Sequence, residues 1–251
     1  MLRALLLVIS VPLLLAPSAH AQSVCAAQEP DPVDPRERCD EAPAARCAPS
    51  SGFRSVSARP RADGLRLGFR RARARRVTVD VFQHSAGRRV LGERRVAHFP
   101  ARRRSLTWKG RRGSDGLYSA RFVMALPGGL RDVRRVALVR RGGRFSRRPA
   151  FYRRVSCGLL SSFKLERPAF GGRRNRSLGI AFRLTRAARV TVVVRRGGNV
   201  VRRLGTAVRG AGVTHRLRVG SERLRRGDHV VQLTVRRGSR TLCARLTAAR
   251  L

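Results

Sequence analysis

The chain has 251 residues, of which 57 are Lys or Arg and 14 are Asp or Glu, and its formal net charge is +43. Such a charge attracts polyanions of every kind, among them nucleic acid, anionic lipid headgroups and anionic wall polymers. After the first 21 residues, no segment has the roughly 20 apolar residues that a membrane helix needs, so we expect no membrane span.

The basic residues are nearly all arginines, because only Lys109 and Lys164 are lysines. Ala, Gly, Val and Leu are also abundant, as GC-rich codon usage would produce. A surface selected to bind polyanions usually mixes both cations. Codon bias is therefore the favoured explanation of the arginines, and a selected polyanion-binding surface is the alternative.

The first 21 residues have the pattern of a secretory signal peptide. Arg3 gives the positive start, an apolar stretch follows from Ala4 to Ala16, and Ala19-His20-Ala21 has the form of a cleavage site. The apolar stretch is too short for a membrane anchor. Because Cys25 is not directly preceded by small residues, a lipoprotein is disfavoured. We expect an exported, soluble mature chain that begins at Gln22.

Residues 22–50 are acidic and rich in Pro, with almost no large apolar side chain. Such a segment cannot bury enough apolar surface to offset the entropy lost on ordering. We interpret it as a flexible linker or tail, locally tied by disulfides. Because its charge opposes that of the rest of the chain, the alternative is that it lies on the arginine-rich surface.

From about Phe53 the chain reads as many short strands separated by Gly-containing turns. The predicted strands of the first half are 65–69, 77–82, 90–91, 105–108, 118–126 and 133–139. Those of the second half are 163–165, 178–184, 190–194, 200–204, 215–219, 229–235 and 241–246. Three Arg-Arg-Gly turns, at 140–143, 195–198 and 236–239, are predicted hairpin tips. This pattern is typical of β-sandwiches.

The sequence also repeats over the length of a domain. Val77-Thr78-Val79-Asp80-Val81 returns 113 positions later as Val190-Thr191-Val192-Val193-Val194, and the offset falls to 111 from Leu106 over Leu217 onward. At the front, Cys47 to Phe53 matches Cys157 to Phe163 in spacing. We therefore predict an all-β chain with two tandem immunoglobulin-like sandwiches, at 51–155 and 156–251.

Four short motifs in the first half carry a family resemblance. They are Val77-Thr78-Val79-Asp80-Val81-Phe82, Gly87-Arg88-Arg89-Val90, Leu106-Thr107-Trp108-Lys109-Gly110 and Asp115-Gly116-Leu117-Tyr118. Together they resemble the immunoglobulin-like domain of flagellar hook-capping proteins, which also occurs as an accessory module in bacterial extracellular proteins. The second half is a degenerate copy, with Val219 for the Trp and His229 for the Tyr. The resemblance implies a β-sandwich and brings no catalytic residues.

No catalytic, phosphate-binding or metal-binding motif is present, so we expect no enzyme activity, no cofactor and no metal. Trp108 and Tyr118 are expected in the core, with a stacking platform for sugars or bases as the alternative. The mature histidines are expected on the solvent side or in turns; they are His84, His98, His215 and His229. Asp228 and His229 are neighbours on a strand and should point to opposite faces.

Five cysteines in an exported chain indicate disulfides. Cys157 and Cys243 open and close the second predicted sandwich, whose first and last strands can lie side by side, so we predict that they pair. Cys47 then pairs with Cys25 or Cys39 or stays free, which leaves room for a second disulfide among these three. The odd count leaves one thiol free or bound to another molecule.

These observations predict a secreted, non-enzymatic protein of the cell wall or exterior that acts as a structural, adhesion or accessory binding module. Its partner would be an unknown protein or an anionic envelope polymer. The alternative is a polyanion-binding protein whose arginine surface holds a wall polymer, extracellular DNA or anionic lipid. Non-specific binding to nucleic acid is compatible with either reading.

Overall fold

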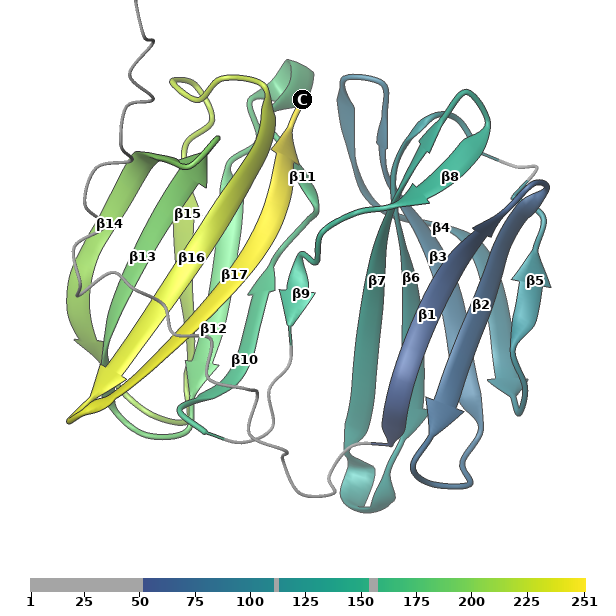
Figure 1. Cartoon of the computed structure of the whole chain (residues 1–251), viewed down its shortest axis with the longest axis horizontal. Coiled ribbons are helices and arrows are strands. Elements are labelled where there is room, and N and C mark those ends of the chain that lie inside the picture. Colours follow the sequence, from purple (N-terminus) through teal and green to yellow (C-terminus); the bar gives the residue numbers. More distant parts are fainter. Residues whose placement is uncertain (1–51, 111–112, 154–157) are drawn as a thin grey trace, which may run out of the picture. The chain divides into compact units, whose positions relative to one another are not determined.

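The computed structural model describes residues 52–110, 113–153 and 158–251, and these residues form an all-β protein (Figure 1). No helix within these ranges is long and apolar enough to cross a membrane. The predicted signal peptide and the acidic segment 22–50 lie outside the described residues.

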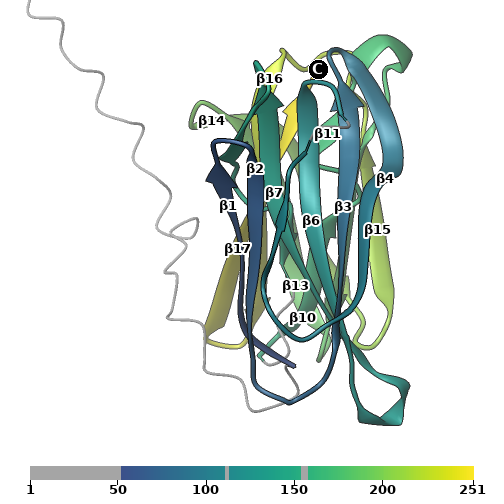
Figure 2. The same cartoon turned by 90° about the vertical axis from the view of Figure 1, so that its right-hand side faces the viewer.

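The first sandwich has two sheets. The smaller sheet has the order β1 (Phe53–Arg61), β2 (Gly64–Arg71) and β5 (Leu106–Trp108). The larger sheet has the order β4 (Arg89–Arg102), β3 (Val77–Ala86), β6 (Gly116–Ala125), β7 (Arg131–Arg141) and β8 (Arg144–Arg147). A short 3-10 turn, η2 (Pro127–Gly129), joins β6 to β7. Figure 2 shows β4, β3 and β6 side by side.

One core fills the space between these sheets. Val77, Val79 and Val81 point inward from β3, because alternate residues of a strand face the same side, and they pack with Leu65 and Leu67 of β2. Residues from both sheets belong to this single buried cluster, which is what defines a sandwich rather than two separate layers.

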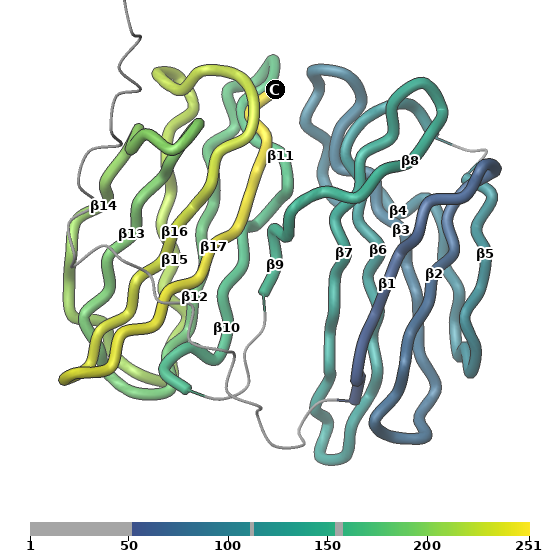
Figure 3. Tube along the Cα trace, viewed as in Figure 1, coloured from purple at the N-terminus to yellow at the C-terminus, as the bar shows by residue number. Residues whose placement is uncertain are grey.

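The second sandwich has the same plan. Its smaller sheet has the order β15 (Thr214–Val219), β12 (Leu178–Leu184), β10 (Leu160–Leu165) and β9 (Tyr152–Arg153). Its larger sheet has the order β11 (Ala169–Phe170), β17 (Arg240–Arg250), β16 (Gly227–Arg237), β13 (Ala188–Arg196) and β14 (Asn199–Arg209). The 3-10 turn η3 (Gly172–Arg174) follows β11. Figure 3 shows β13–β14 and β16–β17 as narrow hairpins.

Strand pairing confirms the repeat and its change of offset. Val77 pairs with Met124 in the first sandwich, and Val190 pairs with Val235 in the second. Adding 113 to the residue number in β3 and 111 to the residue number in β6 converts the first pair into the second. Leu65 likewise pairs with Trp108, and Leu178 with Val219, so Val219 occupies the place of the tryptophan.

At the front of the repeat, strand pairing gives a different alignment from the one that the cysteine spacing predicts. Phe53 pairs with Arg71, while Leu160 pairs with Leu184, and both strands carry a register shift directly afterwards. Leu160 is therefore the equivalent of Phe53, and Phe163 is the equivalent of Val56. Cysteine spacing could not reveal this difference of three residues, because loop length changes it without changing the strand register.

All thirteen predicted strands exist, and the three predicted hairpin tips turn through glycines with positive φ: Gly142, Gly143, Gly197, Gly198 and Gly238. The sequence prediction missed β1, β8, β9 and β11 and ended β4 too early. β1 and β4 are edge strands with mostly exposed polar residues, and β1 contains Pro60, a residue that an edge strand tolerates.

Candidate functional site

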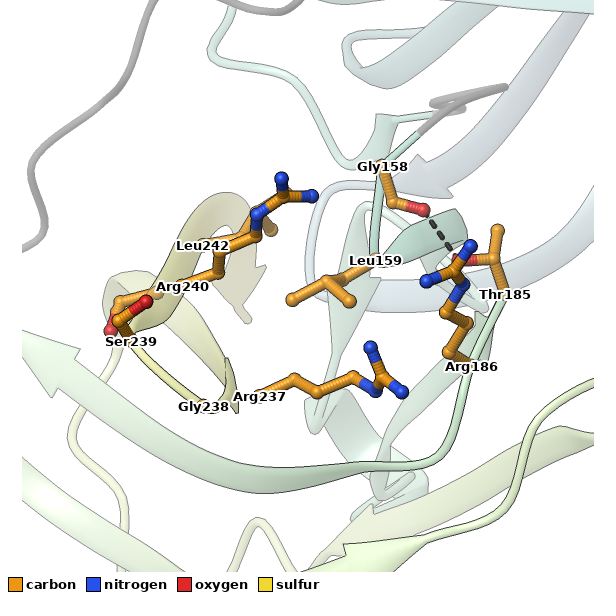
Figure 4. Close-up of a pocket in the computed structure, with 10 residues that line it drawn as sticks. Gly158, Leu159, Thr185, Arg186, Arg237, Gly238, Ser239, Arg240 and Leu242 are labelled. Atoms are coloured by element: carbon orange, nitrogen blue, oxygen red, sulfur yellow. Dashed lines mark hydrogen bonds between the residues drawn. The ribbon is translucent and has the colours of Figure 1, made fainter.

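The second sandwich has a basic groove of about 740 Å³. It lies where the β16–β17 hairpin turns, next to the start of β10 and the loop between β12 and β13 (Figure 4). We call it the hairpin groove, and its lining residues are Gly158, Leu159, Thr185, Arg186, Arg237, Gly238, Ser239, Arg240, Thr241 and Leu242.

Local hydrogen bonds fix the walls of the hairpin groove. The Thr185 amide donates to the Leu159 carbonyl at 3.1 Å, and the Thr185 hydroxyl donates to the Gly158 carbonyl. On the other wall, Arg237 pairs with Arg240 across the hairpin, and Gly238 has a φ of +56°, which a tight turn requires. The backbone of both walls is therefore held in place.

The hairpin groove is strongly electropositive. Arg186, Arg237 and Arg240 are exposed at its rim, and the lining residues include no Asp or Glu. Of the ion pairs in the described part of the chain, none involves these three guanidinium groups. Leu159 and Leu242, both half-buried, supply the apolar part of the lining.

The first sandwich has a corresponding groove of about 660 Å³ at the loop between β2 and β3 and the turn after β6. Those loops are the equivalents, under the repeat, of the β12–β13 loop and the β16–β17 turn. Its lining is again basic and includes no acidic residue among Arg71, Ala74, Arg75, Arg76, Arg103, Ala125, Leu126 and Pro127.

A second polar arrangement surrounds Asp80 on β3. This carboxylate is almost fully buried, yet it lies 2.6 Å from His98 Nδ1 and 2.9 Å from Arg121 Nη2. Burial raises the pKa of Asp80, but hydrogen bonds from His98 and Arg121 outweigh burial and hold the pKa below its usual value of 3.8. Arg121 also covers the ring of Phe82, at 4.6 Å from its centroid. Asp80 is thus a structural anion.

His84 on β3 and Ser119 on β6 form a buried Ser–His pair that is not part of the first sandwich's core cluster. His84 Nε2 lies 2.8 Å from Ser119 Oγ, and both residues are fully buried. Burial lowers the pKa of His84 to about 4, so the imidazole is neutral at pH 7. Its Nδ1 has no hydrogen-bond partner among the described residues, and neither side chain lines the grooves described above. The pair therefore lacks both an orienting acid and an opening to solvent.

The other predicted histidines are structural as well. His215 stacks on Phe182, and His229 is fully buried against Phe170. The expectation of solvent-facing histidines is thus wrong for His84 and His229, because both are buried: the His84 ring lies 5.7 Å from the Phe151 ring and the His229 ring 5.3 Å from the Phe170 ring. Asp228 is exposed while its neighbour His229 is buried, as strand alternation predicts.

The structure places Tyr118 in the core, as expected. Its ring meets Phe145 edge-on at 5.4 Å, and its hydroxyl donates to the Ser114 carbonyl at 2.6 Å. Burial raises the pKa of this phenol. Trp108 is half-buried against the same Phe145, at 5.6 Å. Both aromatics of the resemblance therefore serve packing.

Cys243 on β17 is buried, and its sulfur lies 3.4 Å from the Thr234 hydroxyl. Cys25, Cys39, Cys47 and Cys157 lie outside the described residues, so the Cys157–Cys243 bond and the second pair stay predictions. Among the described residues, no group of three or more His, Cys, Asp and Glu side chains is placed to hold a metal ion.

Sequence reasoning did not single out the hairpin groove. The sequence pattern predicts only a turn at 236–239 and does not distinguish its arginines from other surface charge. The repeat carried a usable signal, because loops at equivalent positions in both halves contain arginines.

No protein-family model matches the chain, and no curated protein matches it. Among solved structures, the chain is similar to one described as "Biofilm associated protein - BSP domain", with 14% sequence identity and a TM-score of 0.26. The match covers 77% of this chain and only 29% of that one. A likeness of this size carries no inference about function.

Proposed function

We propose that the chain is an exported, non-enzymatic module of the cell envelope or exterior, built from two immunoglobulin-like sandwiches with a structural or adhesive role. The observation that carries this proposal is the duplicated sandwich, in which polar groups that often perform chemistry are tied into packing. Asp80 is bound by Arg121 and His98, and His84 is buried against Ser119.

The motifs shared with the hook-capping type of domain support the same proposal, since each has a structural role. Gly110 has a φ of +64° and its backbone lies over the Phe145 ring, while Gly116 packs against the Ser85 carbonyl. Tyr118 closes the same end of the core through its bond to Ser114.

Fractionation of cells that make the protein, with mass spectrometry of the chain, tests export. We expect a mature chain that begins at Gln22 in the envelope or the medium. A pull-down from the envelope fraction, washed at moderate salt, should recover one wall polymer or one protein. A chain that keeps Met1 and stays inside the cell would contradict the proposal.

Binding to polyanions is the second candidate function. It is favoured because several acidic residues are already paired with arginines, while many other arginines remain exposed. Asp80, Glu93, Asp132 and Asp228 each form an ion pair with an arginine. Many other arginines remain on exposed strand positions, such as Arg216 and Arg218 of β15 and Arg202 of β14. The exposed surface therefore keeps an excess of positive charge.

Titration with DNA, heparin and polyphosphate across roughly 50 to 200 mM salt separates selective from non-specific binding. A selective surface would retain one of these polyanions at the upper salt concentration. Equal loss of all three would leave only non-specific charge.

A further inference from the structure

We propose that the hairpin groove of the second sandwich binds an amphiphilic anion, namely a phosphate monoester carried on a short apolar chain. The proposal depends on the chemistry of the groove alone and not on export or adhesion. It therefore stands or falls separately from the function proposed above.

The charge of the rim selects an anion. Arg186, Arg237 and Arg240 surround one opening, and Figure 4 shows the guanidinium groups of Arg186 and Arg237 extending toward the same space. Like charges held together without a counter-charge repel each other, and a bound anion relieves that repulsion. Guanidinium groups bind phosphate oxygens through paired hydrogen bonds, and a doubly charged phosphate monoester suits three of them.

The apolar part of the lining favours a ligand that carries an apolar group as well as a negative charge. Leu159 directly precedes β10 and Leu242 lies on β17, and the Leu159 side chain projects into the space between the two walls (Figure 4). An ion or a fully hydrophilic polymer would leave these side chains in water, whereas an apolar chain attached to the phosphate would cover them.

The repeat supplies an independent observation. The corresponding loops of the first sandwich line a groove with Arg71, Arg75 and Arg76, to which the β4–β5 loop adds Arg103, again without an acidic residue. The basic groove is thus a feature of this end of both sandwiches, although the two grooves share no single arginine position under the repeat. Only the second groove combines three arginines with two leucines, so we assign the amphiphile to it.

Calorimetric titration of the oxidised mature chain with inorganic phosphate, butyl phosphate, octyl phosphate and neutral octyl glucoside tests the proposal. Burying two or three methylene groups on the leucines makes octyl phosphate bind roughly 10- to 60-fold more tightly than inorganic phosphate. Octyl glucoside should not bind measurably. Equal affinity for inorganic phosphate and octyl phosphate would overturn the assignment of an amphiphile.

A matched pair of variants locates the site. Arg237→Gln with Arg240→Gln removes two positive charges from the rim and should weaken octyl phosphate binding about tenfold or more. Arg223→Gln with Arg225→Gln removes the same charge from the loop before β16, at the opposite end of that strand, and should change affinity by less than about twofold. All four arginines are exposed, so both variants should keep the wild-type thermal transition. Equal weakening by both variants would show non-specific charge and refute the site.

Discussion

The backbone of Gly116 lies against the carbonyl oxygen of Ser85, so close that a Cβ on Gly116 would overlap that oxygen. Gly116 also has a φ of +152°. We expect Gly116→Ala to lower the free energy of unfolding by about 3 kcal/mol or more, because both strain and overlap arise. Urea unfolding followed by circular dichroism measures this change.

Gly227, the equivalent of Gly116 in the second sandwich, provides the control. A Cβ there would approach only the Arg196 side chain, at 3.8 Å, although its φ is +115°. Gly227→Ala should therefore lower the free energy of unfolding by about 1 to 2 kcal/mol from backbone strain alone. Equal losses for the two variants would contradict the close approach at Ser85.

His84 makes the stability of the first sandwich depend on pH. Its pKa is about 4 in the folded chain and near 6.5 when unfolded, so only the unfolded chain gains a proton as the pH falls between these values. The contribution of neutral His84 is complete above pH 6.5 and is lost as the pH falls toward 4. Between pH 7.5 and 4.5 the loss is roughly 2 to 3 kcal/mol.

Urea unfolding of the wild type and of His84→Phe at pH 7.5 and 4.5 isolates the contribution of His84 to the free energy of unfolding. The variant should lose roughly 2 to 3 kcal/mol less on acidification than the wild type. Ser119→Ala keeps the buried imidazole, so it should retain the wild-type dependence on pH. If His84→Phe and the wild type lose the same stability, His84 is not the group that titrates.

The Asp80 carboxylate on β3 balances the positive charge of Arg121 on β6. Asp80→Asn removes the anion that binds His98 and Arg121, and we expect a loss of roughly 1 to 3 kcal/mol, reduced because both partners are partly exposed. The contribution of Asp80 is present above pH 3.8 and is lost as the pH falls below it, since the folded chain holds the pKa down.

Thermal unfolding at neutral pH tests this expectation. Glu222→Gln, at an exposed loop position, makes the same chemical change and should alter stability by less than about 0.5 kcal/mol. Equal transitions for Asp80→Asn and the wild type would show that Asp80 contributes nothing.

The β-branched runs and the repeat predicted most of the fold, because Val77 to Val81 and Val190 to Val194 fill their cores by strand alternation. The pattern failed at β1, where Arg and Ser alternate with few apolar side chains and edge pairing decides the structure. It also failed at His84 and His229, since polarity alone does not show that an imidazole is buried against an aromatic ring.

The hairpin groove was harder to predict from the sequence. Its walls come from residues 158–159, 185–186 and 237–242, which only the folded sheets bring together. In a chain with 57 basic residues, Arg186 or Arg237 is not distinctive by itself. What distinguishes these residues is the shared opening beside Leu159 and Leu242.

The positions of Gly158 and Leu242, which are adjacent in sequence to Cys157 and Cys243, bear on the predicted disulfide between these cysteines. A Cβ placed on Gly158, the residue after Cys157, would lie 4.0 Å from Leu242 Cδ1, the residue before Cys243. This proximity suits a bond between the adjacent cysteines. Closing a loop of this length stabilises by about 4 to 5 kcal/mol in the chain-entropy model. Peptide mapping without reduction should recover the two cysteines in one linked pair, and Cys157→Ser, Cys243→Ser and the double variant should lose the same stability. A double variant that loses clearly more than either single variant would show that the two cysteines do not act as one bond.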